Sequence, residues 1–166
     1  MRIVLLALGM ALLPMGAAAQ DADAQVRAYL EHGMAPHAAL GYAADADIAD
    51  LVTPLRLDHP ILWTINLRAG ATYRVYAACD NNCSDLDMEL YGADGQLADR
   101  DVGRDDTPYV QITPTRAGRY NVRIWLYSCR ASACTVGARV VSGGRAVARE
   151  QTSEPASTAA SKSLQQ

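Results

Sequence analysis

The 166-residue sequence contains no phenylalanine, only three histidines and none of the motifs that mark common hydrolases. It has no G-x-S-x-G nucleophile elbow, no H-E-x-x-H zinc motif and no glycine-rich phosphate loop. His32, His37 and His59 all precede the region with strand-like alternation, so we expect surface histidines without a catalytic role. These absences favour a non-enzymatic protein.

The sequence also lacks an apolar run long enough to cross a membrane. The one extended run, Ile3 to Leu13, has about 11 residues, whereas a membrane-spanning helix needs roughly 20. It follows Arg2 and precedes Ala17-Ala18-Ala19, small residues of the kind that signal peptidase cleaves after. We therefore expect residues 1–19 to be a signal peptide and the mature protein to be periplasmic or secreted, without a membrane span.

No excess of positive charge is present. After removal of residues 1–19, which contain Arg2, the chain keeps 14 basic and 18 acidic residues and a formal net charge of −4. This balance argues against nucleic acid as a partner. We expect a monomer.

The four cysteines form two pairs that are close in sequence, Cys79 with Cys83 and Cys129 with Cys134. Three pairings are conceivable, and oxidation is expected in an exported chain. Because both intervening segments are small or turn-like, we predict the local bridges Cys79–Cys83 and Cys129–Cys134. A four-thiolate zinc site is the alternative, which an oxidising compartment disfavours.

The spacing of apolar residues changes from helical to alternating along the chain. A short helix is predicted over about residues 23–33, beginning near Asp23 and ended before Pro36, followed by a weak helix or irregular segment. From Ile61 the apolar residues alternate with polar ones, and Leu86, Met88 and Leu90 show this most clearly. Turn signals recur between these stretches, which is typical of a compact all-β domain.

The predicted fold class is therefore all-β: a two-sheet antiparallel β-sandwich, jelly-roll-like, preceded by a short N-terminal helix. We expect a helical and irregular segment over residues 20–60 and the sandwich over residues 61–141. Residues 142–166, rich in Ser, Thr, Ala and Gln, are expected to form a disordered tail.

Two stretches, INLRAGATYRVYAACDNNCSDLDMELYGADGQLADRD and TPYVQITPTRAGRYNVRIWLYSC, carry several motifs in a characteristic order. They resemble the bacterial pre-peptidase C-terminal (PPC) domain, a small β-sandwich, over about residues 61–141. The resemblance implies a module that accompanies exported enzymes and helps with their secretion, folding or binding to polymeric substrates. No peptidase is attached to this chain, so its function has to be argued from its own site.

Oxygen-bearing side chains cluster after Cys79 and suggest a calcium site. Asp80, Asn82, Asp85 and Asp87 lie within eight positions, and further carboxylates are available at Asp101, Asp105 and Asp106. The glycine and glutamate of an EF-hand loop are missing, however. The alternative is a turn closed by the bridge, with Asp85, Asp87 and Glu89 facing arginines such as Arg123 or Arg74; we expect this alternative, and hence no cofactor.

Trp125 and Tyr127 lie on a predicted strand, opposite its apolar face. An exposed pair of aromatic rings could stack on a sugar, but we expect the N-terminal segment to cover them. The sequence thus predicts a non-enzymatic exported binding or accessory module of the cell envelope. An envelope protein, an exported enzyme or a polysaccharide is the expected partner, and a calcium-stabilised structural module or a carbohydrate-binding module is the alternative.

Overall fold

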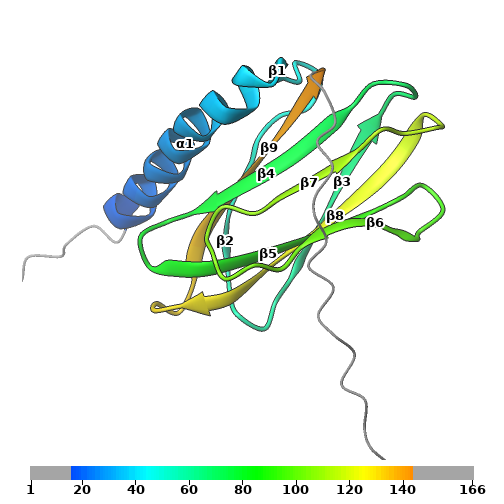
Figure 1. Cartoon of the computed structure of the whole chain (residues 1–166). Helices are drawn as coiled ribbons and strands as arrows, with labels where there is room; N and C mark the ends of the chain where they lie inside the picture. The colour runs from blue at the N-terminus through cyan, green and yellow to red at the C-terminus, as the bar shows by residue number, and fades with distance from the viewer. Residues whose placement is uncertain (1–15, 144–166) are drawn as a thin grey trace, which may run out of the picture.

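The computed structural model describes residues 16–143, with side chains from Asp21 onward. Two antiparallel sheets face each other, and one helix, α1 (Gly16–Ala39), lies against the outside of one of them (Figure 1). The predicted all-β sandwich with an N-terminal helix is confirmed. The expected signal peptide falls largely, and the expected tail almost wholly, outside the described residues.

The first sheet has the strand order β1-β9-β4-β7, with β2 also paired to β9. Its strands are β1 (Tyr42–Ala44), β2 (Leu51–Leu55), β4 (Tyr73–Cys79), β7 (Tyr109–Ile112) and β9 (Cys134–Gly143). The second sheet has the order β3-β8-β5-β6. Its strands are β3 (Ile61–Leu67), β5 (Cys83–Tyr91), β6 (Leu97–Asp101) and β8 (Gly118–Cys129).

The core lies between the two sheets, where the alternating apolar residues of each strand meet. Leu86, Met88 and Leu90 of β5 are buried, as their alternation predicts. Opposite them, the first sheet contributes Tyr73, Val75, Ala77, Val136, Ala138 and Val140. In a chain without phenylalanine, Tyr73 is the largest fully buried side chain, and its hydroxyl accepts a hydrogen bond from the Arg68 amide at 3.2 Å.

The N-terminal region differs from the prediction in three respects. Helix α1 begins at Gly16, before Asp23 and within the residues expected to form the signal peptide. Helix α1 continues through Pro36 to Ala39, because the residues after the proline still pack on the sheet and offset the one backbone hydrogen bond that it removes. The following segment is neither helical nor wholly irregular, since β1 and β2 both pair with β9. The first sheet therefore begins before Ile61.

Helix α1 packs on the outer face of the first sheet through Val26 and Leu30, which are both fully buried. Gly137 of β9 makes this approach possible, because a Cβ atom there would lie 2.4 Å from Val26 Cγ1 and 3.0 Å from Leu30 Cδ1. Arg139 adds polar contacts: it donates to both carboxylate oxygens of Asp50 at 2.9 and 2.7 Å and to Glu31 of α1 at 2.5 Å. The helix is thus fixed by both apolar and charged contacts.

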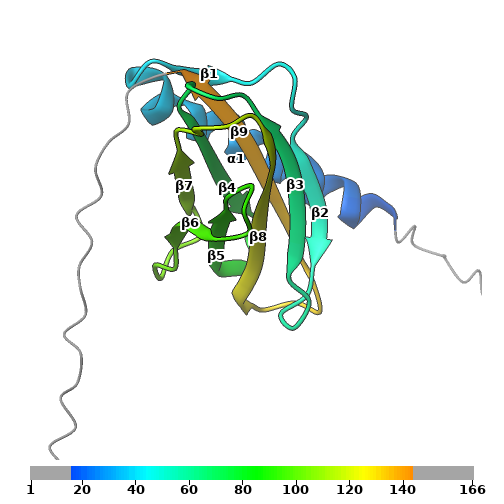
Figure 2. The same ribbon diagram turned by 90° about the vertical axis from the view of Figure 1, so that its right-hand side faces the viewer.

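The two sheets are also joined at one edge by side chains of β6. The Asp99 carboxylate accepts a hydrogen bond from the Gln111 amide at 2.7 Å, and Asp101 accepts one from the Tyr109 amide at 3.1 Å. Both amides belong to β7, the edge strand of the first sheet, and point away from β4. These contacts close one side of the sandwich (Figure 2).

Candidate functional site

Both predicted disulfides are present, and they lie at the same end of the sandwich. Cys79–Cys83 joins β4 to β5 and Cys129–Cys134 joins β8 to β9, with Cα–Cα distances of 5.9 and 6.1 Å. Each bridge therefore links two strands that are consecutive in the sequence but belong to different sheets. Cys83 and Cys129 are partners across the β5–β8 ladder, so the two bridges stand side by side.

Inside the first bridge, Asp80 organises the turn. It is 5% exposed, and its two oxygens accept hydrogen bonds from the amides of Asn82 at 2.9 Å and Thr135 at 2.6 Å. Asn81 joins the turn to α1, because its side-chain oxygen accepts a hydrogen bond from the Tyr29 hydroxyl at 2.6 Å. Both Asp80 oxygens thus satisfy backbone donors.

Asp87 lies on the outer face of the second sheet, opposite Trp125 in the β5–β8 register, and is 5% exposed. Burial, with the neighbouring charges of Asp85 and Asp101, raises the pKa of Asp87 to about 6, although a hydrogen bond from Trp125 acts in the opposite direction. Burial and then the charge of Asp105 raise the pKa of Asp85 as well, and one Asp85 oxygen is buried without a hydrogen-bond partner.

The predicted arginine partners are found for only one of the three carboxylates on β5. Arg123 pairs with Glu89 at 3.1 Å, as expected. Within residues 21–143, Asp85 and Asp87 form no ion pair with an arginine, and Arg74 lies on the other sheet, so this part of the prediction is wrong. The pairing fails because the β5–β8 register sets Asp87 opposite Trp125 and Asp85 opposite Ser128, so neither carboxylate faces an arginine across the ladder.

The four calcium candidates fall into two groups, with Asp80 and Asn82 in the bridged turn and Asp85 and Asp87 on β5. In the described part of the chain, no three side chains of His, Cys, Asp or Glu are grouped so as to hold a metal ion.

Trp125 is half-buried, and the guanidinium carbon of Arg123 lies 4.4 Å from the centre of its indole ring. Tyr127, two residues further along β8, is 73% exposed and lies where the β5–β8 register shifts, a β-bulge. Because α1 packs on the first sheet, the expectation that the N-terminal segment covers these aromatic residues is wrong (Figure 1).

We use the term open face for the outer surface of the second sheet. We restrict it to seven of the residues on that surface: Leu62, Asp85, Asp87, Glu89, Arg123, Trp125 and Tyr127. Leu62 is 63% exposed beside Arg123, so the surface combines apolar, aromatic and charged groups.

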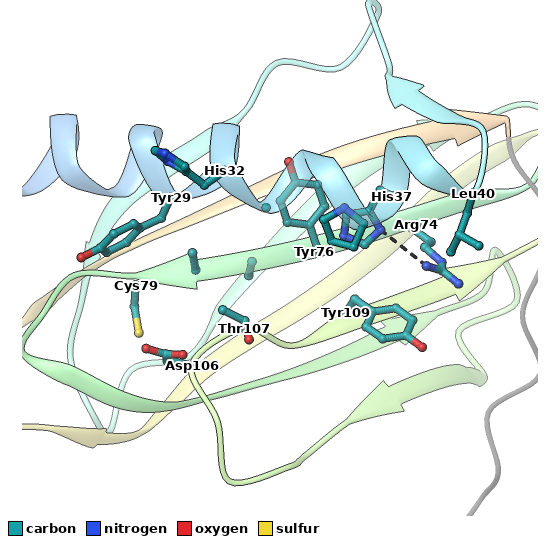
Figure 3. A pocket seen from close by; sticks show the side chains of 14 residues that line it. Tyr29, His32, His37, Leu40, Arg74, Tyr76, Cys79, Asp106, Thr107 and Tyr109 are labelled. Atoms are coloured by element: carbon teal, nitrogen blue, oxygen red, sulfur yellow. Dashed lines mark hydrogen bonds between the residues drawn. The ribbon is translucent and has the colours of Figure 1, made fainter.

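A second feature, which the sequence did not predict, is a pocket of about 610 Å³ between α1 and the β4–β7 half of the first sheet (Figure 3). His37 stacks on Tyr76 there with ring centres 4.4 Å apart, so it is not the surface residue that we expected. Burial and then the nearby Arg74 charge lower the pKa of His37 to about 4, so it is neutral at neutral pH.

No helix of the described residues is long and apolar enough to cross a membrane. No protein-family model and no curated protein matches the sequence.

Solved structures similar to this chain include two of low sequence identity. The periplasmic inhibitor of g-type lysozyme PliG from Aeromonas hydrophila shares 18% identity over 57% of this chain and 85% of its own, with a TM-score of 0.44. The pre-peptidase C-terminal domain of a Bacillus anthracis collagenase shares 15% identity over 55% and 87%, with a TM-score of 0.41. The domain that the sequence motifs resemble is therefore among the solved structures similar to this chain.

Proposed function

We propose that this protein is an exported, non-enzymatic binding module of the cell envelope, and that the open face is the surface with which it contacts a protein partner. The observation that carries the proposal is the asymmetry of the sandwich. Helix α1 packs on the outer face of the first sheet, whereas the second sheet presents Leu62, Arg123, Trp125 and Tyr127 on a face to which α1 does not extend.

The residue types on the open face favour a protein over a sugar. Tryptophan, tyrosine and arginine are the side chains that most often dominate binding energy in protein interfaces. Sugar stacking needs a free ring face, but Arg123 covers one face of Trp125. A polysaccharide is a second candidate because the Tyr127 side chain is 73% exposed and its ring is accessible.

Within residues 21–143 the histidines take part in no catalytic arrangement, which supports a non-enzymatic role. Of the three histidines, His37 is buried and stacked, while His32 and His59 lie exposed on α1 and in the β2–β3 turn. Export is supported by the predicted signal peptide and by two disulfides, which persist in oxidising compartments.

The test is capture of envelope proteins by the mature chain, followed by cross-linking and mass spectrometry. The double variant Leu62→Ser/Tyr127→Ala removes two exposed side chains of the open face, and Leu57→Ser, 44% exposed in a turn outside that face, is the control. We expect the double variant to lose a partner that the wild type and the control retain.

Capture that is identical in all three proteins would contradict the assignment of the open face. In parallel, sedimentation with insoluble cell-wall polysaccharide tests the second candidate. Binding that depends on Tyr127 there, without protein capture, would replace the protein partner by a polysaccharide.

A further inference from the structure

The pocket beneath α1 lies on the opposite side of the sandwich from the open face and is separate from the proposed function. Its walls are mainly apolar and aromatic, with Pro36 and Leu40 from the helix side and Tyr76 and Tyr109 from the sheet (Figure 3). A volume of about 610 Å³ lies within the range of roughly 300–1,000 Å³ that holds small organic ligands.

One charged side chain lines this pocket from a buried position. Arg74 of β4 is 4% exposed. Its Nε and Nη2 atoms donate to Gln111 Oε1 at 3.3 Å, and Nη1 lies 3.5 Å from His37 Nδ1. Its guanidinium carbon lies 4.9 and 4.7 Å from the ring centres of Tyr42 and Tyr109. All of these partners are uncharged, because burial keeps His37 neutral at neutral pH.

Arg139 is the other buried arginine of the first sheet, and its positive charge is neutralised within the protein. It pairs with two carboxylates, those of Glu31 and Asp50. Arg74 pairs with no carboxylate of residues 21–143. A buried cation is stable when an anion compensates it, and a guanidinium binds a carboxylate through two parallel hydrogen bonds.

We propose that the pocket beneath α1 binds a small organic acid, with its carboxylate on Arg74 and its apolar body along the aromatic wall. Asp106 and Cys79 lie toward the opposite end of the pocket from Arg74 (Figure 3). A second anionic group on the ligand would therefore approach the Asp106 carboxylate and be repelled. The site consequently selects a monocarboxylate over a dicarboxylate of the same length.

The probe is decanoate, used below its micelle-forming concentration and titrated calorimetrically into the mature protein at pH 7.5. Decanedioate and 1-decanol are the comparison compounds, since one adds an anion and the other removes it. Chemical-shift changes in ¹⁵N-labelled protein locate the binding site. We expect decanoate to bind at least tenfold more tightly than either comparison compound, with shifts at Arg74 and Tyr109 and none at the Trp125 indole.

Arg74→Met removes the charge while keeping the bulk of the side chain, and it should weaken decanoate binding by about tenfold or more. Arg56→Met, at an exposed position after β2 and outside both the pocket and the open face, is the control and should leave binding unchanged. Ala78→Leu fills part of the pocket and leaves Arg74 unchanged, so it tests whether decanoate binds in the pocket even if Arg74→Met does not fold. Three results would each overturn the proposal. The first is that decanoate gives no heat of binding with the wild type. The second is that binding survives in folded Arg74→Met or in Ala78→Leu, and the third is that the chemical-shift changes are confined to the open face.

Discussion

Substituting Asp87 by asparagine tests the electrostatics of the open face directly. Asp87 is buried, has no arginine partner among residues 21–143, and lies near Asp85 and Asp101. Its pKa is raised from 3.8 to about 6, so above pH 6 the fold contains an ionised carboxylate in an unfavourable place. Asparagine keeps the shape and the acceptor for Trp125 but carries no charge.

The size and sign of the effect follow from the pKa. Each pKa unit corresponds to about 1.36 kcal/mol, so a rise of roughly two units predicts that Asp87→Asn stabilises the fold by about 2–3 kcal/mol at pH 7.5. Because the folded state holds this proton more tightly than the unfolded state, the contribution of Asp87 to stability falls as pH rises from about 4 to about 6. At pH 4 the carboxyl of the unfolded chain is still about half ionised, so the gain should be small there, and it should vanish near pH 3, where the carboxyl is largely neutral in both states.

Urea denaturation of wild type and variant at pH 4 and pH 7.5 measures this difference. Asp58→Asn is the matched control, because Asp58 is exposed in the β2–β3 turn and should change the free energy of unfolding little at either pH. The reasoning is refuted if Asp87→Asn destabilises the protein at pH 7.5, or if its effect is the same at both pH values.

Three further predictions concern the rest of the molecule. Replacing Cys79 and Cys83 together by serine should lower the free energy of unfolding by about 2 kcal/mol or less, since the closed loop is short; a loss well above this in chemical denaturation would contradict it. Arg139→Met should lower the free energy of unfolding by about 3 kcal/mol because it leaves Asp50 and Glu31 without their cation. Arg68→Met should lower it much less, because the Arg68 side chain is 69% exposed and water screens its ion pair; equal losses in the two variants would contradict this. Millimolar calcium should leave the melting temperature of metal-free protein unchanged, and a rise that disappears in Asp85→Asn/Asp87→Asn would instead establish the calcium-stabilised module.

The sandwich itself was predictable because its signals are local. Alternation in β5 assigns Leu86, Met88 and Leu90 to one face wherever the strand is placed, and the structure buries all three. The bridges were predictable for a similar reason, since each pair of cysteines flanks a turn of three or four residues.

The pocket could not be predicted, because it depends on where the helix lies. In β4, Arg74, Tyr76 and Ala78 alternate with core residues in the manner of a solvent-facing row, yet all seven residues of the strand are buried. The helix covers that row, and its position depends on the missing side chain of Gly137 in a strand more than a hundred residues away from Val26. Nothing in the local pattern around residue 137 indicates that contact.

The prediction that arginines pair with all three carboxylates of the open face was wrong for a different reason. Alternation correctly placed Asp85, Asp87 and Glu89 on the outer face, but it gives no information on cross-strand partners. The register sets Asp87 against Trp125 and Glu89 against Arg123, so only one of them meets a cation.

The hydrogen bonds from β7 to Asp99 and Asp101 have a consequence for encounters between molecules. A strand at the border of a sheet normally offers unpaired amides on which another chain can add itself, and β7 has no proline or lysine to prevent this. Two of its amides are already engaged by carboxylates held on β6 of the same chain. A strand from another molecule would have to displace both carboxylates before it could pair with β7. Removing the carboxylates of Asp99 and Asp101 would therefore leave β7 open to pairing with another copy of the chain.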